Sequence, residues 1–152
     1  MMKPISVWKQ ELSGGAHAAR LAALYCCAPD QTPAQAARYE AVLDGLEATF
    51  GPHAEAGLYS APGRTEIGGN HTDHQHGRVL AGSVNIDMIA AAGPNTLGQL
   101  RVQSEGYDLC VIDLNDLAAR KEEENTSAAI LRGECEAFRQ RGAKLSGLDV
   151  YI

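Results

Sequence analysis

The 152-residue sequence predicts an α+β fold, in which a mixed or antiparallel sheet has helices packed on one side. Apolar residues recur at helical spacing in the N-terminal third and again near residue 130, which predicts helices. Short alternating or apolar segments, bounded by glycine and proline, predict strands. Hydrophobic residues make up 45% of the chain and aromatics only 5%, so Ala, Leu, Val and Ile are expected to form the core of a single domain.

The N-terminal third is expected to be helical. Residues 5–27 follow a helical pattern that a pair of glycines interrupts and a proline ends. Residues 32–35, Thr-Pro-Ala-Gln, predict an N-cap, a first-turn proline and a capping-box partner, and Gly51 stops the helix that follows. Residues 1–54 are therefore expected to form a helical extension of residues 55–152 within one domain.

Strands are expected from residue 58 onward. Residues 58–61 predict a short strand, which Pro62 turns into a polar loop. The apolar run of residues 78–92 predicts a buried strand, and Asp87 within it is expected to be paired and to shape a site. The Gly-Pro-Asn sequence at residues 93–95 predicts a turn.

The C-terminal third combines a predicted hairpin, a helix and a strand. Residues 100–112 alternate around a Glu-Gly turn, and the charged run that follows them is expected to be solvated. Residues 125–142 predict a helix that begins at hydroxyl and amide side chains and ends at a glycine. Residues 148–152 alternate as a strand. The apolar side of the helix is expected to consist of three residues: Ile130, Leu131 and Phe138.

The last strand suggests an expectation about the whole protein. The chain stops inside residues 148–152, so a longer protein is expected to have been cut at this point. A sheet interrupted at its last strand is expected to expose unpaired backbone groups and apolar surface. We therefore expect self-association through an exposed sheet edge.

Composition and charge exclude several classes of function. The formal net charge of −6, without any run of five basic residues, argues against nucleic-acid and membrane partners. No segment reaches the roughly 18 apolar residues that a membrane span requires, and the N-terminus lacks the apolar core of a secretory signal. The four cysteines have no C-x-x-C spacing and are expected to be reduced, in or near the core of a cytoplasmic protein.

Residues 61–87, APGRTEIGGNHTDHQHGRVLAGSVNID, hold the densest group of reactive side chains. Arginine, glutamate, aspartate and three histidines lie among glycines there, which is typical of a binding or catalytic loop. His71, Asp73, His74 and His76 are potential ligands for zinc or another transition metal. A metal-dependent hydrolase would need further distant ligands, however, and His17 and His53 both lie upstream, so no metal site is predicted.

The sequence Gly63 to His74, GRTEIGGNHTDH, resembles the galactokinase signature G-R-V-N-L-I-G-E-H-T-D-Y, which marks the sugar-binding side of the GHMP kinase superfamily. Residues 77–80 and 84–87 are similar to the G-x-V-L-P and A-I-D segments that follow it in the family. Residues 131–133 and 148–152 are similar to two later segments, so that the resemblance covers roughly residues 55–152. It implies a fold like that of ribosomal protein S5 domain 2, here as part of a kinase N-terminal domain.

The resemblance also implies residue roles. Asp73 would accept hydrogen bonds from two sugar hydroxyls, as a carboxylate can. Asn70 and His71 would face the C6 end of the sugar, and Arg64 would lie near the transferred phosphate as a catalytic residue. Glu66 stands where the family has asparagine and is a further substrate-binding candidate.

Two departures from the family limit these roles. Asn70 replaces the family's glutamate, and removing that negative charge beside C6 could admit a uronic acid as well as galactose. His74 replaces the family's tyrosine.

The family's nucleotide loop, P-x-G-x-G-L-S-S-S-A, does not occur in these 152 residues, and its catalytic aspartate follows that loop. The intact enzyme is expected to use ATP and Mg²⁺ to phosphorylate the anomeric hydroxyl of a hexose. This chain alone is expected to hold neither cofactor and to be inactive. A non-catalytic sugar-binding or regulatory module remains an alternative, as does a metal-dependent hydrolase that uses residues 71–76.

Overall fold

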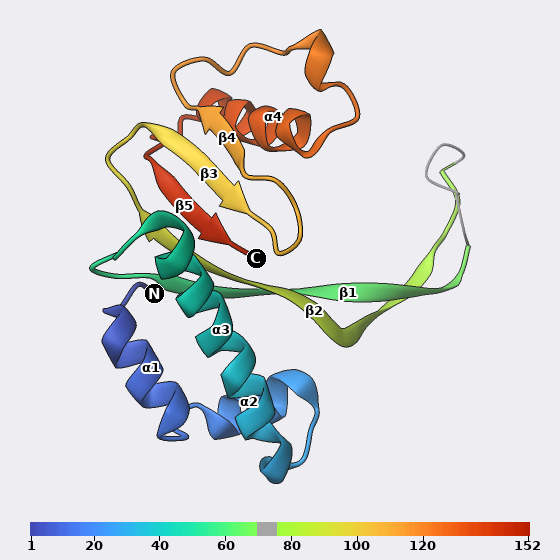
Figure 1. Ribbon diagram of the computed structural model, residues 1–152. Coiled ribbons are helices and arrows are strands. Elements are labelled where there is room, and N and C mark those ends of the chain that lie inside the picture. The colour runs from blue at the N-terminus through green and yellow to red at the C-terminus, as the bar shows by residue number, and fades with distance from the viewer. Residues whose placement is uncertain (70–75) are drawn as a thin grey trace.

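The computed structural model describes residues 1–69 and 76–152, and Figure 1 shows their arrangement. Among the described residues, no helix is both long enough and apolar enough to cross a membrane. In chain order, the elements are α1 (Ile5–Ser13), α2 (Ala18–Tyr25), the 3₁₀ turn η1 (Pro29–Gln31), α3 (Thr32–Phe50), β1 (Gly57–Gly68), β2 (Leu80–Pro94), β3 (Gln99–Gln103), β4 (Cys110–Asp113), the 3₁₀ turn η3 (Lys121–Glu123), α4 (Ser127–Gln140) and β5 (Leu148–Tyr151).

The five strands form one mixed sheet in the order β1-β2-β5-β3-β4, which confirms the predicted α+β class. The last strand, β5, lies in the centre, antiparallel to β2 and parallel to β3. Val150, for example, lies opposite Ala92 on one side and Val102 on the other. The prediction that the terminal strand leaves an unpaired edge is therefore wrong, because β1 and β4 are the edge strands of the described sheet.

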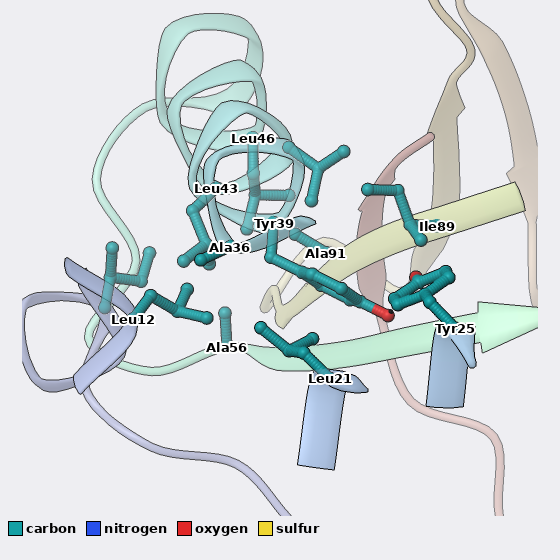
Figure 2. Packing of buried hydrophobic residues seen from close by; sticks show 12 residues of the cluster. Leu12, Leu21, Tyr25, Ala36, Tyr39, Leu43, Leu46, Ala56, Ile89 and Ala91 are labelled. Atoms are coloured by element: carbon teal, nitrogen blue, oxygen red, sulfur yellow. Dashed lines mark hydrogen bonds between the residues drawn. The ribbon is translucent and has the colours of Figure 1, made fainter. Parts of the chain in front are cut away.

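Helices α1, α2 and α3 cover one face of the sheet and enclose the main hydrophobic core (Figure 2). Leu43 and Leu46 of α3 are fully buried there, and they pack with Ala91 and Ile89 of β2. The burial of apolar side chains in this layer is the main favourable contribution to folding. Aliphatic residues dominate the core as predicted, and Tyr25 and Tyr39 pack among them.

The start of α3 differs from its predicted capping box. Thr32 is already helical, and its hydroxyl donates to the carbonyl of Pro29 (2.8 Å) instead of accepting a bond from the helix. The predicted partner, Gln35, accepts a bond from Arg38. The preceding 3₁₀ turn satisfies the backbone at this end, so the cap is not needed. The predicted end is confirmed, since Gly51 has a φ of 86°.

Helix α4 is separate from the other three helices and packs against β4 (Figure 1). Its N-cap is Thr126, one of the three candidates at residues 125–127, but its predicted apolar side is wrong because Ile130 is 65% and Phe138 is 60% exposed. The inward side carries Arg132, which is buried and bonded to both carboxylate oxygens of Glu123 at 2.6–2.7 Å. Glu123 is therefore an internal ion-pair partner, not a solvated residue of the charged run.

The four cysteines are all free, as predicted. Cys26, however, is exposed at the left-handed C-cap of α2 (φ 48°), whereas Cys27 packs against the core.

Strands β1 and β2 form a long antiparallel hairpin whose outer part extends away from the rest of the molecule (Figure 1). We call residues 57–61 and 88–92 the base, and the described residues 62–69 and 76–87 the arm. The predicted start of a loop at Pro62 is wrong, because β1 continues to Gly68. The predicted buried strand is also wrong over the arm, where Ile86 is 77% exposed. The helices cover the base and contact the arm only beside it, at Asn85, whose amide donates to the carbonyl of Tyr25 (3.2 Å), and at Asp87. The apolar pattern of the rest of the arm therefore has no core to join.

Candidate functional site

The arm carries the candidate site residues that the structure describes. Arg64 and Glu66 lie on β1, opposite Ser83 and Ala81 of β2, and both are exposed. Because they are two residues apart on one strand, their side chains lie on the same face. Among the described residues neither forms an ion pair, so Arg64 and Glu66 do not neutralise each other. Both are thus available to a ligand.

The other candidates, Asn70, His71 and Asp73, lie outside the described residues, as do most of the potential metal ligands among residues 71–76. Within residues 1–69 and 76–152, no group of three His, Cys, Asp or Glu side chains could hold a metal ion.

Two glycines of the β1 side of the arm allow β1 and β2 to approach closely. Gly69 has a φ of 89°, and a Cβ atom on it would collide with the carbonyl of Arg78. A Cβ on Gly63 would lie 3.2 Å from the carbonyl of Ile86. Glycine is required at residue 69 on both grounds, since other residues rarely adopt this φ and have no room there. The two strands therefore stay together up to the residues that precede Asn70.

Asp87 lies where the arm joins the base, directly opposite Pro62, and its side chain is only 3% exposed. Its Oδ2 accepts hydrogen bonds of 2.6 Å from both Tyr25 of α2 and Ser60 of β1. Its Oδ1 accepts a 2.8 Å bond from the guanidinium of Arg38 in α3. The prediction that Asp87 is paired when buried is confirmed, and its partners come from three separate elements.

The bonds to Asp87 outweigh the cost of burying its charge. Burial by itself raises the pKa of the Asp87 carboxyl, but the bonds from Ser60, Tyr25 and Arg38 lower the pKa below its ordinary value. Burial and the bond to Asp87 also raise the pKa of Tyr25, which shares a 2.8 Å hydrogen bond with Tyr39. Asp87 is therefore an ionised acceptor with three donors around it. This arrangement suits a residue that holds the arm in place, not one that accepts protons from a substrate.

Asp87 is predictable as a paired residue from its place in an apolar strand, whereas its partners are not. Tyr25 and Tyr39 fit the apolar pattern of the two predicted N-terminal helices, and no local pattern marks Arg38 or Ser60 as a partner. Tyrosine hydroxyls usually find a partner when they are buried, so two core tyrosines above an embedded Asp were a usable signal.

A second buried carboxylate, Asp149 of β5, holds the centre of the sheet. Arg101 of β3 donates two bonds of 2.7 Å to its two oxygens, and Asn95 donates a third of 2.6 Å. His53, which follows α3, lies 3.0 Å from the same group. These partners join β5 to β3, to the segment after β2 and to the end of α3, far along the sheet from the arm.

Known proteins are similar to this chain over the region that contains the arm. A family model described as the galactokinase galactose-binding signature matches residues 46–94, which include Arg64, Glu66, Asn70, His71 and Asp73. The galactokinase of Streptomyces coelicolor is 33% identical over 98 residues, which are 63% of this chain and 25% of that protein. The galactokinase of Lacticaseibacillus casei is 27% identical over 112 residues, or 73% of this chain and 29% of that protein. The chain thus spans between a quarter and 30% of the length of these relatives.

A solved structure shows the same fold. The crystal structure of Lactococcus lactis galactokinase complexed with galactose superposes with a TM-score of 0.64 at 20% sequence identity, over 78% of this chain and 30% of that one. The similarity confirms that the mixed sheet and its helices have the arrangement of the N-terminal part of that protein.

Proposed function

Because the chain is homologous to the N-terminal, galactose-binding region of galactokinases, we propose that it binds galactose, or a closely related hexose, at the end of the arm. The match of the galactose-binding signature to residues 46–94 carries this proposal. In it, Asp73 accepts hydrogen bonds from two ring hydroxyls, while His71 and Asn70 contact the C6 end. Glu66, exposed on the same strand face as Arg64, offers a further acceptor to the sugar.

Arg64 has the chemical role of a fixed cation in this proposal. It is exposed and has no carboxylate partner among the described residues, so its charge is available to a phosphoryl group. In the whole enzymes of the family, the reaction would be ATP- and Mg²⁺-dependent phosphorylation of the anomeric hydroxyl. Arg64 would then stabilise negative charge on the transferred group.

The residues of this chain do not fit the nucleotide and its metal. The sequence has no glycine- and serine-rich phosphate loop, and the described residues contain no cluster of three metal-ligating side chains. A polypeptide of these 152 residues is therefore proposed to bind sugar without transferring phosphate. A non-catalytic sugar-binding module has the same expected behaviour.

Calorimetric titration of the 152-residue protein with galactose tests the binding proposal. We expect saturable binding that Asp73→Asn weakens by about tenfold or more, because the change removes the negative charge and replaces one of the two acceptor oxygens with an NH₂ donor. Asp108→Asn, an exposed aspartate of the β3–β4 turn, is the matched control. No binding by the native chain, or equal binding by the Asp73→Asn variant, would contradict the proposal. Phosphorylation of any hexose from ATP by this chain would contradict the proposal that it transfers no phosphate.

The substitution at Asn70 favours a second substrate. A neutral amide in place of the family's glutamate removes charge repulsion against an anionic C6 group. Galacturonate is therefore titrated in parallel, and Asn70→Glu is expected to weaken galacturonate binding while leaving galactose binding nearly unchanged. Galacturonate binding that is undetectable in the native chain would contradict this specificity.

A further inference from the structure

A second cleft, separate from the arm, lies between the N-terminal helices and the outer strand β1. Helices α1 and α2 pack on α3, and a hollow of about 510 Å³ remains between them and β1. This volume is within the range of small-molecule sites, roughly 300–1,000 Å³. Its walls are formed by Trp8, Leu12, Leu21, Leu24 and Leu58, with Tyr59 at the side of β1.

The cleft is apolar inside and open at the mouth. Leu12 and Leu21 are about 5% exposed and form part of the core beneath it (Figure 2). Leu24 and Tyr59 are about half exposed, although both are large and apolar. Trp8 is fixed at one side by a 2.8 Å bond from its indole N–H to the carbonyl of Ala56. The inner surface is thus already organised for an apolar body.

The ionisable side chains that line the cleft include basic groups but no carboxylate. None of the residues that line the cleft is Asp or Glu, in a chain with 19 acidic residues and a net charge of −6. Arg20 lines it from α2 and has no carboxylate partner among the described residues. His17 also lines it, held by Glu11 through Nε2 (2.8 Å), while Lys3 balances the charge of that glutamate (2.6 Å). The unpaired cation of the cleft is therefore Arg20.

Two of the three hydroxyls that line the cleft have partners already, and the third belongs to Tyr59, which is 52% exposed. Ser60 donates to Asp87, and the hydroxyl of Tyr39 is bonded to that of Tyr25. A ligand therefore gains little from polar groups along its length and most from one acidic group near Arg20.

We propose that this cleft binds a small amphipathic monocarboxylate, with its apolar chain against Trp8 and the leucines and its carboxylate at Arg20. The site is distinct from the proposed sugar site, since Arg20 and Trp8 belong to the N-terminal helices and Arg64 to the arm.

Octanoate is the probe, and Trp8 reports its binding because it is the single tryptophan of the chain and lines the cleft. We expect a saturable change in Trp8 fluorescence with octanoate, a weaker change with octylammonium, and none with acetate, which lacks the apolar chain. Galactose is expected not to compete, so failure of this proposal is distinguishable from failure of sugar binding.

Two variants and a control separate the roles of charge and space. Arg20→Gln is expected to weaken octanoate binding by about two- to fivefold, the scale of an exposed ion pair, and to leave octylammonium binding unweakened. Ala23→Phe, which fills the lining from α2, is expected to abolish both. Arg141→Gln removes an exposed arginine after α4 and is expected to change neither. Non-saturable octanoate binding, or equal affinity in the native and Arg20→Gln proteins, would overturn the proposal.

Discussion

The base and the arm of the β1–β2 hairpin have similar apolar sequences but opposite surroundings. In the base, Ala91 is fully buried and Ile89 is 8% exposed beneath α3. In the arm, Ile67 and Ile86 are 67% and 77% exposed, although they belong to the same two strands. The difference shows that a strand pattern predicts pairing between strands, whereas burial also requires a second layer to cover the face.

Within this one hairpin, the base contributes to stability and the arm carries the candidate functional residues. The base takes part in the core, and Asp87 joins it to the arm through groups of α2, α3 and β1. The arm carries Arg64 and Glu66 and contributes little buried area of its own. Substitutions in the two regions should therefore have different consequences.

The largest effect is expected beneath the base. Leu46→Ala removes a fully buried side chain of α3 and leaves a cavity, so the free energy of unfolding should fall by about 4 kcal/mol in urea denaturation. The matched change in the arm, Ile67→Ala, should cost less than about 0.5 kcal/mol because that side chain is mostly exposed. Similar losses for the two variants would contradict the comparison.

A somewhat smaller loss is expected at the centre of the sheet. Asp149→Asn leaves the guanidinium of Arg101 without its carboxylate in a buried site, which should lower the free energy of unfolding by about 3 kcal/mol. Chemical denaturation at pH 7 measures this loss. An unchanged stability would show that Arg101 finds another partner.

The pH dependence of stability tests the same group. Burial raises the pKa of the Asp149 carboxyl, but bonds from Arg101, Asn95 and His53 lower it below the ordinary value. A carboxyl with a lowered folded-state pKa contributes stability above its unfolded-state pKa of about 3.9 and loses that contribution as the pH falls further. The native protein should therefore lose stability below about pH 4 more steeply than the Asp149→Asn variant.

An intermediate effect is expected where the arm joins the base. Asp87→Asn weakens the charge-assisted bonds from Arg38, Tyr25 and Ser60, which should cost about 2 kcal/mol of unfolding free energy. It should also increase hydrogen exchange of the amides at residues 63–68 more than in the base, which a purely global loss of stability would not do. Asp108→Asn serves as the control, and uniform exchange along the hairpin would contradict a positioning role.

The smallest effect on stability is expected for the exposed face of the arm. Ile86→Ser should change the free energy of unfolding by no more than about 0.5 kcal/mol, since Ile86 has little buried area to lose. If the native protein self-associates through the arm, light scattering at high concentration should show a smaller mean mass for the variant. An equal mass for both proteins would exclude this face of the arm from self-association.

Local signals predicted several elements correctly. The apolar spacing and Gly51 defined α3, the alternating segments defined the β3–β4 hairpin, and residues 125–127 indicated the start of α4. The signature sequence pointed to residues 63–74 as the candidate site, and the family match includes them. Each of these signals depends on neighbouring residues, whose interactions are present wherever the segment lies in the fold.

The failed predictions, apart from the capping box at Thr32, concern contacts between different elements. The sequence did not reveal that Pro62 continues a strand, that Ile130 and Phe138 are exposed, or that Glu123 pairs with Arg132. Each of these depends on which element covers a given face.

The sequence by itself determined the helices, most of the strands and the identity of the polar residues at the candidate site, because hydrophobic periodicity and turn residues act locally. Only the tertiary structure decided that β5 is central, that Asp87 and Asp149 are each surrounded by donors from several elements, and that the base is covered while the arm is not. The physical reason is that strand order, burial and the pairing of buried charges are properties of contacts between segments far apart in the chain.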